Sequence, residues 1–194
     1  MHRSPRPIGL VALHFALLAI VISLSAVVAP TAALAEDEDD EELEFARPGV
    51  YAMVNVVGAL GVDRQNDETE LSGGAGYNLR LGSRESARLA WEVEFENVIT
   101  DGTANQSFTY GINGKFFFME DFLQPYVVLG AGGYTVLRTG EHHRTDWGFR
   151  MGLGADLYLT KRWALNMENT YVVGVGDLLR SEYASFSVGV LYRF

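Results

Sequence analysis

Apolar and polar residues alternate in short stretches along most of the chain from Gly49 to Phe194. A period of two is the pattern of β-strands, and no part of this region sustains the 3.6-residue period of a helix over three turns. Glycine separates the stretches, and eight of them are long enough to be strands. They cover residues 50–60, 72–82, 87–98, 104–118, 124–138, 145–158, 162–174 and 183–194.

The last of these strands has the most regular pattern. Its odd positions carry mainly Ser185, Ser187, Gly189 and Arg193, with Leu191 the one large apolar exception. Its even positions are apolar and end on an aromatic residue, which resembles the terminal strand of bacterial outer-membrane β-barrels. In that family such an ending is the signal that the membrane-insertion machinery reads. The resemblance implies an insertion signal made of Phe186, Val188, Val190, Tyr192 and Phe194. A soluble amphipathic edge strand is the alternative.

Most of the other strands also divide into one apolar face and one polar face. The polar face is rich in glycine and carries the charged residues. These are Arg80, Arg88, Glu92, Glu94, Glu96, Lys115, Arg150, Asp156 and Glu168. The strands at 50–60 and 124–138 are apolar on both faces, so alternation cannot orient them. For the second one we expect Tyr126 and Tyr134 to point outward.

A soluble barrel of the lipocalin kind would show the same alternation turned inside out. Two features favour a membrane barrel. Aromatic residues of the apolar face gather near both ends of the strands, as interfacial girdles do, and glycine on the polar face suits a crowded lumen. The region 49–194 thus resembles the small eight-stranded outer-membrane barrel family, which includes the transmembrane domain of OmpA. This implies an all-β fold, a closed eight-stranded antiparallel up-and-down transmembrane β-barrel.

Connections between the strands alternate in length, as they do in that family. Three are short, at 83–86, 119–123 and 159–161; the others, at 61–71, 99–103, 139–144 and 174–182, are mostly longer and more polar. Outer-membrane barrels place tight turns in the periplasm and larger loops outside the cell. Because the number of strands is even, both termini are expected on the periplasmic side.

Residues 1–35 read as a secretory signal peptide. Arg3 and Arg6 precede an apolar run over 8–29, Pro30 ends it, and small residues at 33–35 suit a cleavage site near Ala35. A retained anchor is the alternative, because the run is nearly long enough to span a bilayer. The sequence contains no cysteine, which excludes thiol nucleophiles, cysteine metal sites, a lipoprotein attachment site and disulfides.

Eight of nine residues over 36–44 are acidic, and we expect 36–48 to be a disordered periplasmic tail. Weak binding of a divalent cation or a partner is the alternative reading of this stretch. Loss of residues 1–35 removes two arginines and no acid, so the net charge falls from −10 to −12. An acidic protein of this kind is not expected to bind nucleic acid.

A membrane barrel must close, since unpaired backbone groups are costly in lipid, and eight strands leave room inside only for side chains. The inward charges should then pair with one another. Arg150–Glu168 is the first pair we expect, on a register with Arg150 opposite Thr170 and Tyr158 facing Arg162. The network is expected to be structural, and a gated ion path through rearranged pairs is the alternative.

Candidates for catalysis or metal binding are few. Outer-membrane lipid A deacylases use a His-x-Ser pair with a carboxylate, but here Arg144 stands where that serine should be. His142 and His143 with Glu141 or Asp146 could bind zinc or copper, yet adjacent histidines on an extended loop point apart. Gly130–Gly133 lies within a strand pattern, with no following helix to make a phosphate loop. We expect no enzyme activity, no metal and no cofactor.

The expected protein is therefore a monomeric outer-membrane barrel, plugged by inward polar and charged side chains, with a structural or surface-interaction role. Its expected partners are outer-membrane lipid and lipopolysaccharide, and the insertion machinery and periplasmic chaperones during assembly. A narrow channel for ions or small solutes is the alternative. A third possibility is that the external loops bind a ligand or a surface, with 62–70 as the most exposed polar candidate.

Overall fold

The computed structural model describes residues 45–61, 73–100, 104–138, 144–175 and 182–194. It contains eight strands in chain order: β1 (Gly49–Gly61), β2 (Gly73–Arg84), β3 (Leu89–Thr100), β4 (Ala104–Phe117), β5 (Leu123–Arg138), β6 (Arg144–Tyr158), β7 (Trp163–Gly174) and β8 (Tyr183–Arg193). The predicted signal peptide, acidic residues 36–44 and loop 62–70 lie outside the described residues. No helix in the described ranges is both long enough and apolar enough to cross a membrane.

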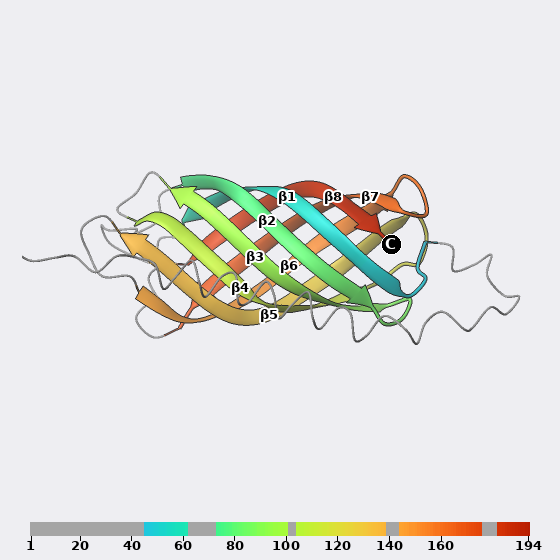
Figure 1. Cartoon of the computed structure of the whole chain (residues 1–194), viewed down its shortest axis with the longest axis horizontal. Coiled ribbons are helices and arrows are strands. Elements are labelled where there is room, and N and C mark those ends of the chain that lie inside the picture. Colours follow the sequence, from blue (N-terminus) through green and yellow to red (C-terminus); the bar gives the residue numbers. More distant parts are fainter. Residues whose placement is uncertain (1–44, 62–72, 101–103, 139–143, 176–181) are drawn as a thin grey trace, which may run out of the picture. The chain divides into compact units, whose positions relative to one another are not determined.

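Each strand pairs antiparallel with the next, and β1 pairs with β8, so the sheet is a closed barrel. The closing seam runs from Tyr51 opposite Arg193 to Gly61 opposite Tyr183. Figure 1 shows the tilted strands following one another around the barrel, with the start of β1 and the C-terminus at the same end. The predicted fold class is confirmed, because every strand finds two neighbours and no edge is left.

The two ends of the barrel differ in how the strands connect. We call the end with the connections 85–88, 118–122 and 159–162 the turn end, and the opposite one the loop end. At the turn end between β6 and β7, Leu159 N–H donates to Trp163 O at 2.9 Å. Tyr158 consequently pairs with Ala164 and not with Arg162, so the predicted register of this hairpin is wrong by two residues. An even shift leaves every side chain on its predicted face.

The outer face carries a broad belt of exposed apolar side chains. Val56 is 72% exposed, and Leu129 and Leu153 are each 64% exposed. Aromatic pairs flank the belt at the turn end, where the Trp163 and Tyr192 rings lie 4.7 Å apart. Water-soluble monomers rarely expose apolar patches of such extent, whereas a bilayer-spanning barrel requires them. The outward-facing Asn169 of β7 is a polar exception within this belt.

Four aromatic side chains lie close to a glycine on the neighbouring strand. Inside the barrel Tyr51 covers Gly82 and Tyr126 covers Gly154; outside, Trp91 covers Gly114 and Tyr110 covers Gly133. A Cβ atom at Gly82 or Gly154 would lie within 2.4 Å of the tyrosine ring. Glycine is therefore needed at these two positions, because the tyrosine ring approaches the backbone closely. The expectation that Tyr126 and Tyr134 point outward is wrong, because both are fully buried inside the barrel.

Replacing Leu153 by Arg should lower the free energy of unfolding by about 2–4 kcal/mol, the usual cost of a cationic side chain at the bilayer midplane. Leu153 lies halfway along β6 on the exposed apolar face. Urea titration of the barrel refolded into lipid bilayers measures the change. Leu159, which is 62% exposed and lies in the connection at the turn end, provides the control, and Leu159→Arg should cost only about 0–1 kcal/mol. If Arg changed the free energy of unfolding equally little at both positions, the outer face could not lie against a bilayer.

Candidate functional site

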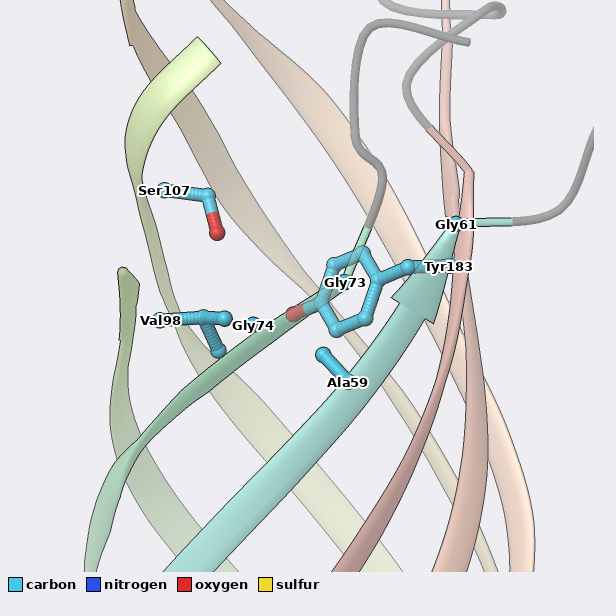
Figure 2. Close-up of a pocket in the computed structure, with 7 residues that line it drawn as sticks. All are labelled: Ala59, Gly61, Gly73, Gly74, Val98, Ser107 and Tyr183. Atoms are coloured by element: carbon cyan, nitrogen blue, oxygen red, sulfur yellow. The ribbon is translucent and has the colours of Figure 1, made fainter. Parts of the chain in front are cut away.

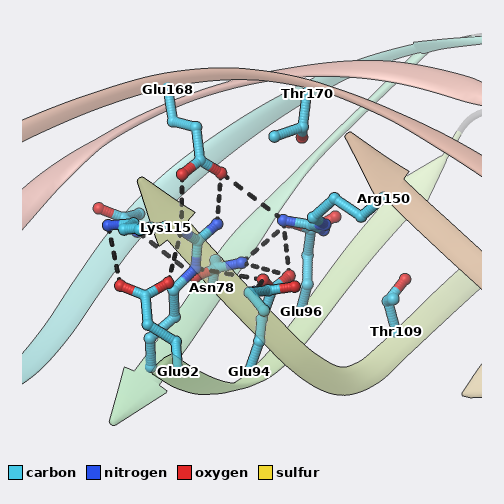
Figure 3. A network of polar contacts seen from close by, with 12 residues as sticks. Asn78, Glu92, Glu94, Glu96, Thr109, Lys115, Arg150, Glu168 and Thr170 are labelled. Carbon is cyan, nitrogen blue, oxygen red and sulfur yellow. Dashed lines mark hydrogen bonds and ion pairs between the residues drawn. The ribbon is translucent and has the colours of Figure 1, made fainter. Parts of the chain in front are cut away.

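A cluster of ionised side chains occupies the middle of the barrel lumen. Its members come from five strands and are each at most 4% exposed: Arg80, Glu92, Glu94, Glu96, Lys115, Arg150, Asp156 and Glu168. They lie inside because each occupies the polar parity of its strand, opposite the apolar outer face. Figure 3 shows Glu168 facing Glu92 and Glu94 from the opposite side of the cluster, with Lys115 and Arg150 to either side. We call these eight residues the ionic cluster.

Arg80 is the centre of the ionic cluster. Its Nη1 and Nη2 atoms donate to both oxygens of Glu168, at 2.7 and 2.6 Å, which joins β2 to β7 directly through the lumen. The same guanidinium lies 3.3 Å from Glu92 Oε2 and 3.2 Å from Glu94 Oε2. A fork that binds one carboxylate with two parallel hydrogen bonds is the strongest geometry available to an arginine.

Arg150 pairs mainly with two glutamates of β3. Nη1 lies 2.6 Å from Glu94 Oε1, and Nη2 lies 2.7 Å from Glu96 Oε2. The pair with Glu168, which the sequence favoured, is the longest of its contacts at 3.9 Å. Arg150 pairs in register with Val172, so Glu168 lies four residues from the position opposite Arg150, and not two as predicted.

Lys115 forms the third cationic position. Its Nζ lies 2.8 Å from Glu92 Oε1 and 4.2 Å from the centre of the Tyr126 ring. The Lys115–Glu92 contact, like that of Arg80 Nε with Glu94, is close enough for an ion pair but is not aligned as a hydrogen bond. Coulomb attraction holds these pairs, since it depends on distance and not on the direction of the N–H bond.

Three tyrosine hydroxyls and three amides complete the contacts of the carboxylates. Tyr51 donates to Glu92 at 2.7 Å, Tyr126 to Glu168 at 2.8 Å and Tyr183 to Glu96 at 2.6 Å. Asn78 donates to Glu94 and Glu96, Asn113 to Glu94, and Asn166 to Asp156. A buried carboxylate is tolerable only when hydrogen-bond donors satisfy it, and these neutral residues supply those donors.

The tyrosines are the part of the site that sequence reasoning missed. Tyr51 and Tyr126 lie on the two strands that are apolar on both faces, so alternation could not place them. The glycines opposite them, Gly82 and Gly154, were the available signal, because a large ring fits best over a residue with no side chain.

Arg88 lies outside the ionic cluster, in contrast to the prediction. It belongs to the connection between β2 and β3, its side chain is 63% exposed, and it pairs with Glu120 at 3.0 Å on the surface of the turn end. The strand pattern was extended two residues too far at this point, since β3 begins at Leu89. All the other residues predicted for the lumen network are buried inside the barrel.

Unfilled space next to the cluster is small. A shallow hollow near the loop end, where the Tyr183 ring lies close to Ala59, Gly73 and Gly74, has no room for a water molecule (Figure 2). A second hollow, with a volume of about 10 Å³, lies beside Glu94, Asn113 and Arg150. The described ranges contain no group of three or more His, Asp or Glu residues able to hold a metal ion. The histidine candidates His142 and His143 lie outside them.

Several solved structures are similar to this barrel. Neisserial surface protein A is 16% identical, with a TM-score of 0.57 over 75% of this chain and 97% of that one. OprG from Pseudomonas aeruginosa is 12% identical, with a TM-score of 0.56 over 78% and 99%. The N-terminal β-barrel domain of OprF from the same organism is 12% identical, with a TM-score of 0.53 over 76% and 100%. At such identities the likeness concerns the fold.

No curated protein sequence matches this chain significantly. The family described as outer membrane protein beta-barrel domain matches residues 19–194, which is most of the chain and includes every strand of the barrel. Membership of this family implies the bacterial outer membrane as the location, in agreement with the exposed apolar belt. The chain belongs to the outer membrane protein β-barrel domain family.

Proposed function

We propose that this protein is a closed outer-membrane barrel with a structural or surface-interaction role, and that its ionic cluster plugs the lumen. The observation that carries the proposal is the bidentate contact of Arg80 with Glu168 through the lumen, between β2 and β7, which are not neighbours in the sheet. Ions moving through the lumen would have to separate these charges, which is costly in a confined site that contains little water.

Apolar layers on both sides of the ionic cluster support a closed lumen. The layer toward the turn end contains mainly Tyr51, Met53, Phe117, Tyr126, Val128, Tyr158 and Leu191. The layer toward the loop end contains Val57, Ala59, Val98, Tyr134, Val136, Val172 and Tyr183. These buried side chains fill the lumen above and below the charges and leave little room for a hydrated ion.

Planar-bilayer recording tests the plug. The wild-type barrel should conduct rarely or not at all, whereas Glu168→Ala should conduct more often, because it removes the carboxylate that holds Arg80 across the lumen. Glu120→Ala is the matched control, since Glu120 pairs with Arg88 on the surface of the turn end. A steady, large conductance of the wild type would contradict the plugged barrel and favour a channel.

A narrow channel for ions or small solutes is the second candidate. It is favoured by the number of carboxylates near each arginine: Arg80 contacts three, and Arg150 reaches a third, Glu168, at 3.9 Å. Exchange between such partners could open a path without leaving a charge unpaired. Wild-type recordings with brief, discrete openings that Glu168→Ala makes permanent would support this candidate.

The surface-interaction role is assigned to the external loops, of which 62–70 is the most polar in sequence. This loop lies outside the described residues. Deleting it should abolish binding to a host or envelope surface without changing barrel stability, because β1 and β2 pair from Leu60 and Gly73 onward. Unchanged binding after deletion would remove this loop from consideration.

Catalysis is not part of the proposal, nor are a cofactor, a metal or nucleic-acid binding. We infer instead that the partners are lipid, lipopolysaccharide and the proteins of the assembly pathway. Residues 1–35 would direct secretion and be removed after Ala35, and periplasmic chaperones would deliver the chain. The insertion machinery would then read the terminal strand from Phe186 to Phe194, and the product would be a monomer.

A further inference from the structure

Two arginines at the turn end of the lumen have no carboxylate partner among the residues that the structure describes. Arg84 is 3% exposed and Arg193 is 1% exposed, and neither forms an ion pair with a described residue. Arg84 lies 4.1 Å from the centre of the Phe117 ring, and Arg193 lies 4.6 Å from that of Tyr158. Ring faces and neutral acceptors thus surround two full positive charges.

Arg193 in particular has unused donors. Its Nη2 donates to Phe45 O at 2.8 Å and to the Tyr158 hydroxyl, but Nε and Nη1 are buried with no hydrogen-bond partner among the described residues. Arg84 donates to Gln124 Oε1 at 2.6 Å and to backbone carbonyls of the adjacent turn. Buried cationic donors without an anion are costly, so an acceptor of opposite charge is expected there.

The two arginines flank the same end of β1. Arg84 pairs in register with Gly49 from the β2 side, and Arg193 pairs with Tyr51 from the β8 side. They come together only when β8 closes against β1, because they belong to strands near opposite ends of the chain. The positive site at the turn end is therefore a product of barrel closure.

The chain itself enters this site just before β1. The Phe45 carbonyl is the one that Arg193 binds, the Phe45 ring lies 5.9 Å from that of Tyr158, and Ala46 is completely buried. The residues immediately upstream, Asp39–Glu44, contain five carboxylates and one leucine. Six extended residues span about 20 Å, which is enough to reach both arginines from Phe45.

We propose that Arg84 and Arg193 form a carboxylate-binding site whose occupant is the acidic segment Asp39–Glu44 of this chain. Exposed Arg47 and Arg162 add positive charge to the same end of the barrel. Charge-assisted hydrogen bonds to arginine are the strong kind, and a planar guanidinium suits a carboxylate. The segment binds after the barrel closes and ties the start of β1 to the terminal strand.

The absence of cysteine makes a single-label experiment direct. Leu43→Cys in the full-length folded barrel carries a nitroxide, and electron paramagnetic resonance measures its mobility. The label should be immobilised on the wild-type background and several-fold more mobile with Arg84→Gln. Arg88→Gln is the matched control, because Arg88 is an exposed arginine of the same end that already has Glu120 as a partner. It should leave the label immobilised.

A second variant leaves the barrel sequence unchanged and so avoids any failure to fold. It converts Asp39 and Asp40 to Asn, and Glu41, Glu42 and Glu44 to Gln. Loss of immobilisation in this variant supports the proposal. An equally immobile label would overturn it, since contacts of Phe45 alone would then hold the segment. Equal release by Arg88→Gln and Arg84→Gln would also overturn it, by showing that general positive charge and not a specific site is responsible.

Discussion

Arg80→Met is expected to lower the free energy of unfolding by about 3–5 kcal/mol, the cost of breaking a buried ion pair by removing one partner. Methionine is similar in length but carries no charge. Glu168 would lose both hydrogen bonds of the fork, and Glu92 and Glu94 would lose a cation within 3.3 Å. Urea titration in micelles, followed by tryptophan fluorescence and heat-modifiable mobility on gels, measures the effect.

Arg88→Met provides the matched control for this measurement. The Arg88–Glu120 pair has a good distance of 3.0 Å, but its arginine is largely exposed, and exposed pairs contribute about 0–1 kcal/mol. Arg80→Lys should fall between the two, because one ammonium keeps the charge but cannot contact three carboxylates in the same geometry. An Arg80→Met variant no less stable than Arg88→Met would show that water already fills the lumen.

Phe194→Asp should abolish assembly while leaving secretion across the inner membrane intact. Phe194 N–H donates to Val50 O at 3.0 Å, so the last residue extends the seam that closes the barrel. Its ring is 69% exposed and meets Tyr192 edge-on at 5.2 Å, where the insertion signal of this family would be read. Loss of the heat-modifiable, protease-resistant species in outer-membrane fractions measures the effect.

The Phe118→Asp variant distinguishes two causes of failed assembly. One is loss of recognition by the insertion machinery, and the other is the cost of placing a carboxylate among the aromatic residues at the turn end. Phe118 is 54% exposed at the same end of the barrel and packs edge-on against Phe116, but it directly follows β4 and is not the chain terminus. This variant should assemble with reduced stability. Comparable losses of assembly in both variants would mean that the terminal position has no special role.

Alternation along the chain was sufficient to predict the strands and most of their faces. Side chains of a strand point to opposite sides with a period of two, so Arg80, Glu92 and Glu168 were assigned inward from their apolar neighbours alone. The closed topology followed from the need to pair every backbone group in lipid, and the even number of strands placed both termini at the same end. These properties are local, or follow from the bilayer as a solvent.

Alternation along the strands could not predict which charged side chains pair with one another. A difference in the turn between β6 and β7 shifted the register by two residues, and Arg150 met Glu94 and Glu96 in place of its predicted first partner. Contacts through the lumen depend on the curvature of the whole barrel, which lets side chains of β2 and β7 meet although 88 residues separate Arg80 from Glu168. No spacing within a single strand contains that information.

Strands without alternation show the same division between local and global information. The sequence of β5 is apolar on both faces, and only the glycines of neighbouring strands decided that Tyr126 and Tyr134 fit inside. Likewise, Arg84 and Arg193 are unremarkable strand-end residues in sequence, and closure of β1 against β8 makes them neighbours. The sequence alone determined which face each alternating side chain occupies; the tertiary structure decided which side chains meet, because partners in a barrel are chosen by register and closure.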